Sequence, residues 1–95
     1  MSDKSSQNWT FLSNHSHTLI QISRNPDLKV AELASLIGIT ERSVLSILSD
    51  LETQGYVTVE RVGRRNSYKV NPRKKFRHPS EADHSIGELL EIFSR

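Results

Sequence analysis

The chain has 95 residues, a mass of 10.8 kDa and 35% hydrophobic residues, which is enough for one small core and too little for a two-domain enzyme. It contains no cysteine, which excludes disulfides, thiolate catalysis and a zinc ribbon. No apolar stretch approaches the roughly 20 residues that cross a bilayer, and the start has no apolar signal segment, so we expect a cytoplasmic protein without a membrane segment.

The charge is concentrated in one segment. The formal net charge is only +2, yet residues 61–77 carry eight basic side chains and no acidic one. These are Arg61, Arg64, Arg65, Lys69, Arg73, Lys74, Lys75 and Arg77. Such a run is typical either of a solvated linker or of a site for a polyanion, and its position in the fold decides between them.

The N-terminal part predicts a tail, a helix and a short strand. Residues 1–8 are polar and lack periodicity, which indicates a loose tail. A helix is predicted over residues 9–24, because one face carries Trp9, Leu12, Leu19 and Ile20. Pro26 follows and ends it, and residues 28–30 are interpreted as a short strand.

The next segment has the spacing of two helices joined by a tight turn. Residues 31–37 predict a helix that ends at Gly38, where a left-handed residue is favoured. Thr40 is a good N-cap for a helix that continues to residue 53. Its buried stripe is predicted to be Val44, Ile47, Leu48 and Leu51. With Ala34 at the approach of the two helices and Ile39 under the turn, this pattern favours a helix-turn-helix.

A β-hairpin and a last helix complete the predicted domain. Residues 56–61 and 67–71 are β-prone and are joined by residues 62–66, whose Gly63 and Asn66 tolerate positive φ. Two prolines interrupt the following linker, and residues 80–95 predict a helix. We therefore divide the chain into a tail (1–8), a main domain (9–79) and a C-terminal helix (80–95).

Three segments carry a resemblance to a known family: residues 34–40 (ASLIGIT), 48–57 (LSDLETQGYV) and 63–70 (GRRNSYKV). Residues 30–71 resemble the winged helix-turn-helix of transcription regulators of the multiple-antibiotic-resistance (MarR) and arsenic-repressor (ArsR) kinds. The resemblance implies a mainly α fold with a small β-wing, a recognition helix at residues 40–53 and a dimerising C-terminal helix. It also implies regulation of transcription through sequence-specific binding to double-stranded DNA, without a cofactor.

The recognition helix can be interpreted independently of that resemblance. A turn of 100° per residue places Arg42, Ser46 and Ser49 opposite the buried stripe, with Leu45 at the flank. An arginine can bind guanine O6 and N7 in the major groove, serines can bond to several bases, and a leucine can contact a thymine methyl group. Thr40 and Ser43 lie at the helix N-terminus, where backbone N–H groups favour a phosphate.

The hairpin supplies the second group of candidate DNA-binding residues. In the resembling fold it projects beside the recognition helix, so its polar side chains are expected to lie over the flanking backbone or in the minor groove. These residues are Arg61, Arg64, Arg65, Asn66 and Lys69.

A homodimer would present two recognition helices about 34 Å apart, one turn of DNA. We expect its interface to combine side chains of the first and last predicted helices. These are Trp9, Leu12, Ala82, Ile86, Leu89, Leu90 and Phe93.

Two other classes of function remain open at the level of sequence. A winged-helix protein-interaction module would have the same fold without specific DNA binding. A metal-sensing repressor could use His84 and Glu88, which are one helical turn apart. No nucleophile, P-loop or HExxH motif indicates an enzyme.

Overall fold

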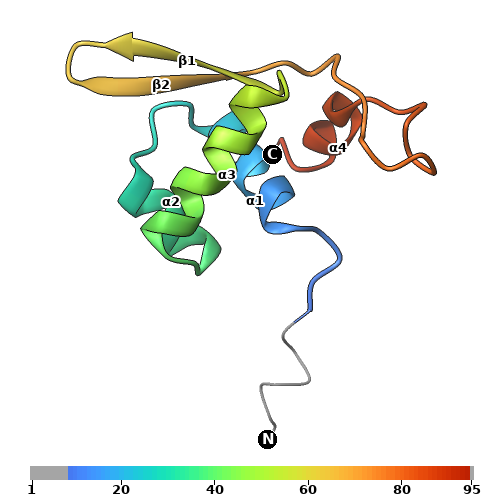
Figure 1. Cartoon of the computed structure of the whole chain (residues 1–95), viewed down its shortest axis with the longest axis horizontal. Coiled ribbons are helices and arrows are strands. Elements are labelled where there is room, and N and C mark those ends of the chain that lie inside the picture. Colours follow the sequence, from blue (N-terminus) through green and yellow to red (C-terminus); the bar gives the residue numbers. More distant parts are fainter. Residues whose placement is uncertain (1–8, 95) are drawn as a thin grey trace, which may run out of the picture.

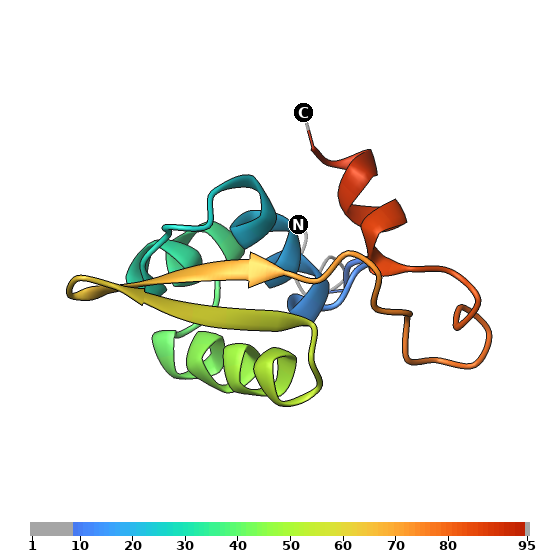
Figure 2. The same ribbon diagram turned by 90° about the horizontal axis from the view of Figure 1, so that it is seen from above.

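The computed structural model describes residues 9–94, so the predicted tail (1–8) and Arg95 lie outside the described residues. The elements follow in the order α1 (Asn14–Arg24), α2 (Val30–Ile37), α3 (Glu41–Thr53), β1 (Val57–Val62), β2 (Arg65–Val70) and α4 (Ile86–Ile92). The hairpin lies above the first three helices (Figure 1), and seen from above it runs between α3 on one side and α1 and α2 on the other (Figure 2). This is the predicted winged helix-turn-helix class.

The core forms where the three N-terminal helices meet the base of the hairpin. Leu33 of α2 and Val44 of α3 are fully buried, and Ile22 of α1 and Val57 of β1 are nearly so. The predicted stripe of α3, which includes Ile47, is confirmed as buried. The opposite side of α3 is therefore directed to solvent.

The turn between α2 and α3 has the predicted geometry. Gly38 adopts a φ of 86°, and its N–H donates to the carbonyl oxygen of Ala34 at 2.8 Å. The N–H of Ile39 donates to the same oxygen at 3.1 Å. Thr40 then caps α3, because its hydroxyl oxygen accepts a hydrogen bond from the backbone N–H of Ser43 at 3.0 Å.

The first helix begins later than its apolar periodicity predicts. It starts at Asn14, after Ser13, whose hydroxyl accepts from the N–H of Ser16 at 3.2 Å. A serine that satisfies a free N–H in this way fixes the start of a helix. The prediction that Trp9 lies on the α1 face is therefore wrong. Trp9 is 68% exposed and Phe11 92% exposed, and their rings meet edge to face at 5.0 Å.

The predicted strand at residues 28–30 is not formed. Leu28 is buried, and Lys29 is the N-cap of α2, where its N–H donates to the carboxylate of Glu32 at 2.8 Å. The edge of β2 instead meets the preceding turn through one backbone bond, from the N–H of Tyr68 to the carbonyl oxygen of Pro26 at 3.0 Å. Because Leu28 is buried and Lys29 already caps a helix, residues 28–30 do not pair with β2 as a strand.

The hairpin has a tighter turn than the five-residue loop predicted. Val62 pairs with Arg65, so only Gly63 and Arg64 form the turn. Gly63 has a φ of 66°, and no other residue type in the described part has a positive φ, which fits a type II′ turn. The turn matches the twist of the strands, so both can extend almost to the tip.

The predicted C-terminal helix (80–95) is present but shorter at both ends, since α4 runs from Ile86 to Ile92. Residues 79–83 form turns, α4 begins only at Ile86, and Ala82 is therefore exposed outside the helix. The backbone N–H of Ser85 donates to the carboxylate of Glu88 at 3.1 Å and defines this start. Ile86 also donates its N–H to the carbonyl oxygen of Lys74 at 2.8 Å, so the linker holds the start of α4.

Candidate DNA-binding surface

The solvent side of α3 carries the predicted small, mostly uncharged side chains. Arg42, Ser46 and Ser49 are exposed, and Leu45 has 56% of its surface exposed. Arg42, Ser46 and Ser49 lie opposite the buried stripe of the same helix and Leu45 lies at its flank, as the 100° rotation predicts. An arginine, two hydroxyls and an apolar group on one helix face form a surface that can contact base edges in a major groove.

The N-terminal end of α3 is arranged by two hydroxyls. The Thr40 hydroxyl donates to the Ser43 hydroxyl oxygen at 2.9 Å and accepts from the Ser43 N–H at 3.0 Å. Both side chains therefore maintain the cap. The N–H groups of Glu41 and Arg42 at the first turn remain outside this pair and face the end of the helix where an anion is favoured.

The basic side chains of the wing surround its tip instead of sharing one face. Arg61 lies opposite Asn66, while Arg65 and Lys69 belong to the other face by strand alternation, and Arg64 is in the turn. Lys69 pairs with Thr58, nearer the base of the hairpin than the tip. All five predicted residues belong to the hairpin, as expected, and they divide between its two faces and its turn.

These cations have no acidic partner. All ion pairs within residues 9–94 involve a histidine, and no lysine or arginine of that part lies within 4.0 Å of a carboxylate oxygen. Glu60 is the one acidic side chain of the described hairpin and lies on the face of Arg65 and Lys69, so the cations outnumber it and keep the wing positively charged. Such a group is favoured only beside an external anion or in well-hydrated surroundings.

A sequence model described as MarR family matches residues 10–65, which is more than half of the chain. The chain belongs to the MarR family. Its helices and hairpin have the winged helix-turn-helix architecture. No curated protein matches the chain.

One solved structure adds a comparison of folds. It is the zinc-dependent MarR family transcriptional regulator AdcR in the Zn(II)-bound state, with a TM-score of 0.50 and 17% sequence identity. The match covers 65% of this chain and 44% of that chain. This chain therefore spans less than half of the length of that regulator, and the shared part shows a common fold.

The residues predicted for a dimer interface of this MarR family member are dispersed. Ile86 and Leu90 are buried in the chain's own core, so their assignment to an interface is corrected. Leu12 packs partly against the core, and Leu89 lines a cleft within the chain. Trp9 and Phe93 are exposed, as are two apolar side chains that the sequence analysis did not assign to an interface, Phe11 and Ile92.

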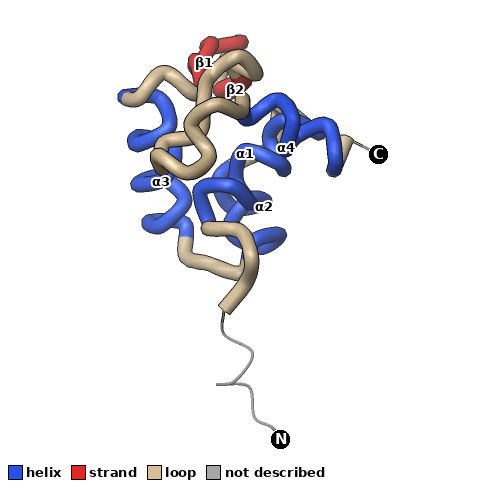
Figure 3. The backbone as a smooth tube through the Cα atoms, turned by 90° about the vertical axis from the view of Figure 1, so that its right-hand side faces the viewer, coloured by secondary structure: helices blue, strands red, loops and turns tan. Residues whose placement is uncertain are grey.

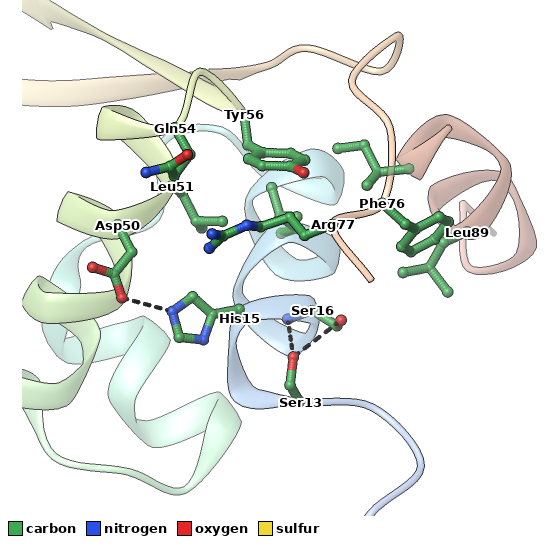
Figure 4. Close-up of a pocket in the computed structure, with 12 residues that line it drawn as sticks. Ser13, His15, Ser16, Asp50, Leu51, Gln54, Tyr56, Phe76, Arg77 and Leu89 are labelled. Atoms are coloured by element: carbon green, nitrogen blue, oxygen red, sulfur yellow. Dashed lines mark hydrogen bonds and ion pairs between the residues drawn. The ribbon is translucent and has the colours of Figure 1, made fainter. Parts of the chain in front are cut away.

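The cleft lies between α1, the C-terminal half of α3, the linker and α4, and measures about 280 Å³ (Figure 4). Its apolar wall includes Leu51 and Phe76. On its polar side, His15 Nε2 of α1 lies 2.8 Å from Asp50 Oδ2 of α3. The guanidinium group of Arg77 extends from the linker toward α3 in the same view. Sequence periodicity gives no signal for this meeting of distant segments.

The histidine and carboxylate pair considered for a metal is present as a simple ion pair. His84 Nδ1 lies 2.9 Å from Glu88 Oε1, and the hydrogen bond and charge of Glu88 raise the pKa of His84. The same bond lowers the pKa of Glu88. Within residues 9–94, no group of three or more histidine, cysteine or acidic side chains could hold a metal ion.

Among the helices of the described residues, none has the length and apolar character of a membrane-spanning segment.

Proposed function

We propose that the protein regulates transcription by binding a specific duplex operator, with α3 in the major groove and the wing on the flanking backbone or minor groove. The observation that carries this proposal is the excess of exposed cations on the wing, none of them within 4.0 Å of a carboxylate oxygen of residues 9–94, next to the exposed small-residue face of α3. A polyanion would supply the missing counter-charge, and its base edges would meet the neutral face. The protein acts by binding, without catalysis.

Two groups of side chains have different roles in this proposal. Arg42 and Leu45 read bases, and Ser46 and Ser49 add hydroxyl contacts. The wing residues Arg61, Arg64, Arg65, Asn66 and Lys69 bind backbone or minor groove and add affinity to any sequence. Since Arg61 and Arg65 project to different faces, the tip can contact phosphates on both sides of the groove that it enters.

A homodimer is part of the proposal, with an interface that differs from the sequence-based prediction. Its apolar area comes from Ile92 and Phe93 at the end of α4, whereas the exposed Trp9 and Phe11 line a hollow with Ile37 at the end of α2 and Ile39 of the turn before α3 and lie outside this interface. Figure 3 shows α3 and α4 on opposite sides of α1, so an interface at the end of α4 leaves α3 accessible. A two-fold axis would space the two α3 helices for successive major grooves.

Oligomeric state is tested by sedimentation at micromolar concentration. We expect about twice the 10.8 kDa of one chain for the natural protein, and a monomer for Ile92→Asp with Phe93→Asp. Leu36→Asp is the matched control, because Leu36 is an exposed apolar residue of α2 away from the proposed interface. A monomer for the natural protein contradicts the dimer.

Selection of fragments from a genomic DNA pool tests sequence-specific binding. We expect enrichment of a palindromic motif, and we expect Arg42→Ala to relax the preference at one base position at a cost of about 1–3 kcal/mol. Binding of duplexes without any enriched sequence would contradict a regulator of specific genes. If no duplex is retained in dilute buffer, the winged-helix protein-interaction module becomes the better interpretation.

A further inference from the structure

We propose that Arg73, Lys75 and Arg77, here called the linker patch, form a second phosphate-binding surface at the C-terminal end of α3. The proposal rests on the function proposed above and extends the DNA footprint beyond the groove that α3 and the wing occupy. The three side chains are exposed, and within residues 9–94 none of them lies within 4.0 Å of a carboxylate oxygen.

The linker between β2 and α4 is held by hydrogen bonds to other parts of the chain, so it is not a loose connection. The N–H of Asn71 donates to the carbonyl oxygen of Tyr56 at 2.9 Å, and the Tyr56 hydroxyl donates to the carbonyl oxygen of Lys75. The N–H of Phe76 donates to the carbonyl oxygen of His84 at 3.1 Å, and its ring packs against the core. A cation on an ordered segment loses less conformational entropy on binding than one on a loose chain.

These anchors place the linker beside the end of α3. Tyr56 follows α3 by three residues, and the Lys74 ammonium lies 5.5 Å from the centre of its ring. Arg77 lines the cleft together with Asp50 and Gln54 of the same end. In Figure 2 the loop between β2 and α4 passes on the α3 side of the molecule, beyond the C-terminal end of that helix.

Charge at this end of α3 explains why cations are needed there. Asp50 and Glu52 are exposed, and the carbonyl groups at a helix C-terminus add partial negative charge. Without compensation this end would repel a phosphate backbone. Lys74 is half-buried on the Tyr56 ring and adds positive charge near the helix end. Lys75 Nζ donates to the carbonyl oxygen of Asp83 at 3.5 Å, so within residues 9–94 Arg73 and Arg77 are the cations of the linker patch whose side chains make no hydrogen bond or ion pair.

Distances along the helix support contact with the backbone. The 13 residues of α3 span about 20 Å, and the proposed base-reading residues Arg42 and Leu45 lie in its first turns. A recognition helix reads bases mainly with its N-terminal residues, so its far end lies near the edge of the groove. A positive segment at that end meets the sugar-phosphate backbone.

The test compares the natural protein with a triple variant that carries Arg73→Gln, Lys75→Gln and Arg77→Gln in the full chain. Both are measured on the duplex fragment that the natural protein enriches. On the complete fragment we expect the slope of log K against log salt to become shallower by up to about 0.9 for each lost contact. Hydroxyl-radical footprints should lose protection only at the outer edges of the site. On a duplex trimmed to the central site, the triple variant and the natural protein should bind equally.

Two controls make the result decisive. Arg73→Lys with Arg77→Lys keeps the charge and should retain the natural slope, while Arg24→Gln removes one exposed cation elsewhere and should change neither slope nor footprint. Equal slopes and footprints for the triple variant and the natural protein would overturn the linker patch and leave the proposed function intact. Failure of the natural protein to enrich any fragment would instead overturn the proposed function.

Discussion

His15 on α1 and Asp50 on α3 are joined across the surface, with 2.8 Å between Nε2 and Oδ2. The side chains remain 46% and 59% exposed. Exposed pairs contribute only about 0–1 kcal/mol, because water screens the charges and two side chains lose freedom. We therefore predict that His15→Ala lowers the free energy of unfolding in urea by less than about 1 kcal/mol. A loss above about 2 kcal/mol would show that the pair organises α3 more strongly than its exposure indicates.

The buried face of α2 should dominate stability. Leu33 is fully buried, so Leu33→Ala should lower the free energy of unfolding by about 2–5 kcal/mol through lost burial and the cavity left behind. Leu36→Ala on the same helix is the matched control, since Leu36 is 57% exposed and should change it by less than about 0.5 kcal/mol. Similar losses for the two variants would mean that α2 is rotated relative to the core described here.

Gly87 permits the close approach of α4 to the linker. A Cβ at this position would lie 2.8 Å from the carbonyl oxygen of Pro72, which accepts the Gly87 N–H at 3.0 Å. An alanine normally stabilises a helix by about 0.5–1 kcal/mol relative to glycine. Here Gly87→Ala should instead destabilise the protein by about 1–3 kcal/mol, because the backbone must move apart. A raised midpoint of thermal unfolding would contradict the docking of α4.

The ion pair at the start of α4 predicts a pH dependence. Glu88 raises the pKa of His84, so the charged histidine stabilises the folded chain below its unfolded pKa. This stabilisation is lost as the pH rises through the raised pKa of the folded state. Titration followed by NMR should show the pKa of His84 falling toward its ordinary value in Glu88→Gln. An unchanged pKa of His84 in this variant would contradict the ion pair.

Much of the fold could be predicted from the sequence, because the deciding signals are local. The stripe ending at Leu51, the glycine at residue 38 and the alternation around Tyr68 depend on neighbours a few residues away. The errors arose where capping overrode periodicity. Ser13 starts α1 after Trp9, and Ser85 starts α4 after Ala82, although apolar spacing continued across both points.

The candidate site was less predictable than the fold. Exposure of Arg42 and Ser46 follows from helical rotation, so these residues could be named in advance. The position of Arg77 beside Asp50 depends on how a linker returns to the end of α3, which no local pattern encodes. The burial of Ile86 in the chain's own core likewise depends on backbone bonds between distant segments.

The salt dependence of duplex binding tests the central claim most directly, that the unpaired cations of the wing bind DNA phosphates. With about six phosphate contacts, the natural protein should give a slope of log K against log salt of about −5. Arg64→Ala with Arg65→Ala should weaken binding to every sequence and make that slope shallower by about 2. Full affinity of the double variant at moderate salt, with an unchanged slope, would contradict the account.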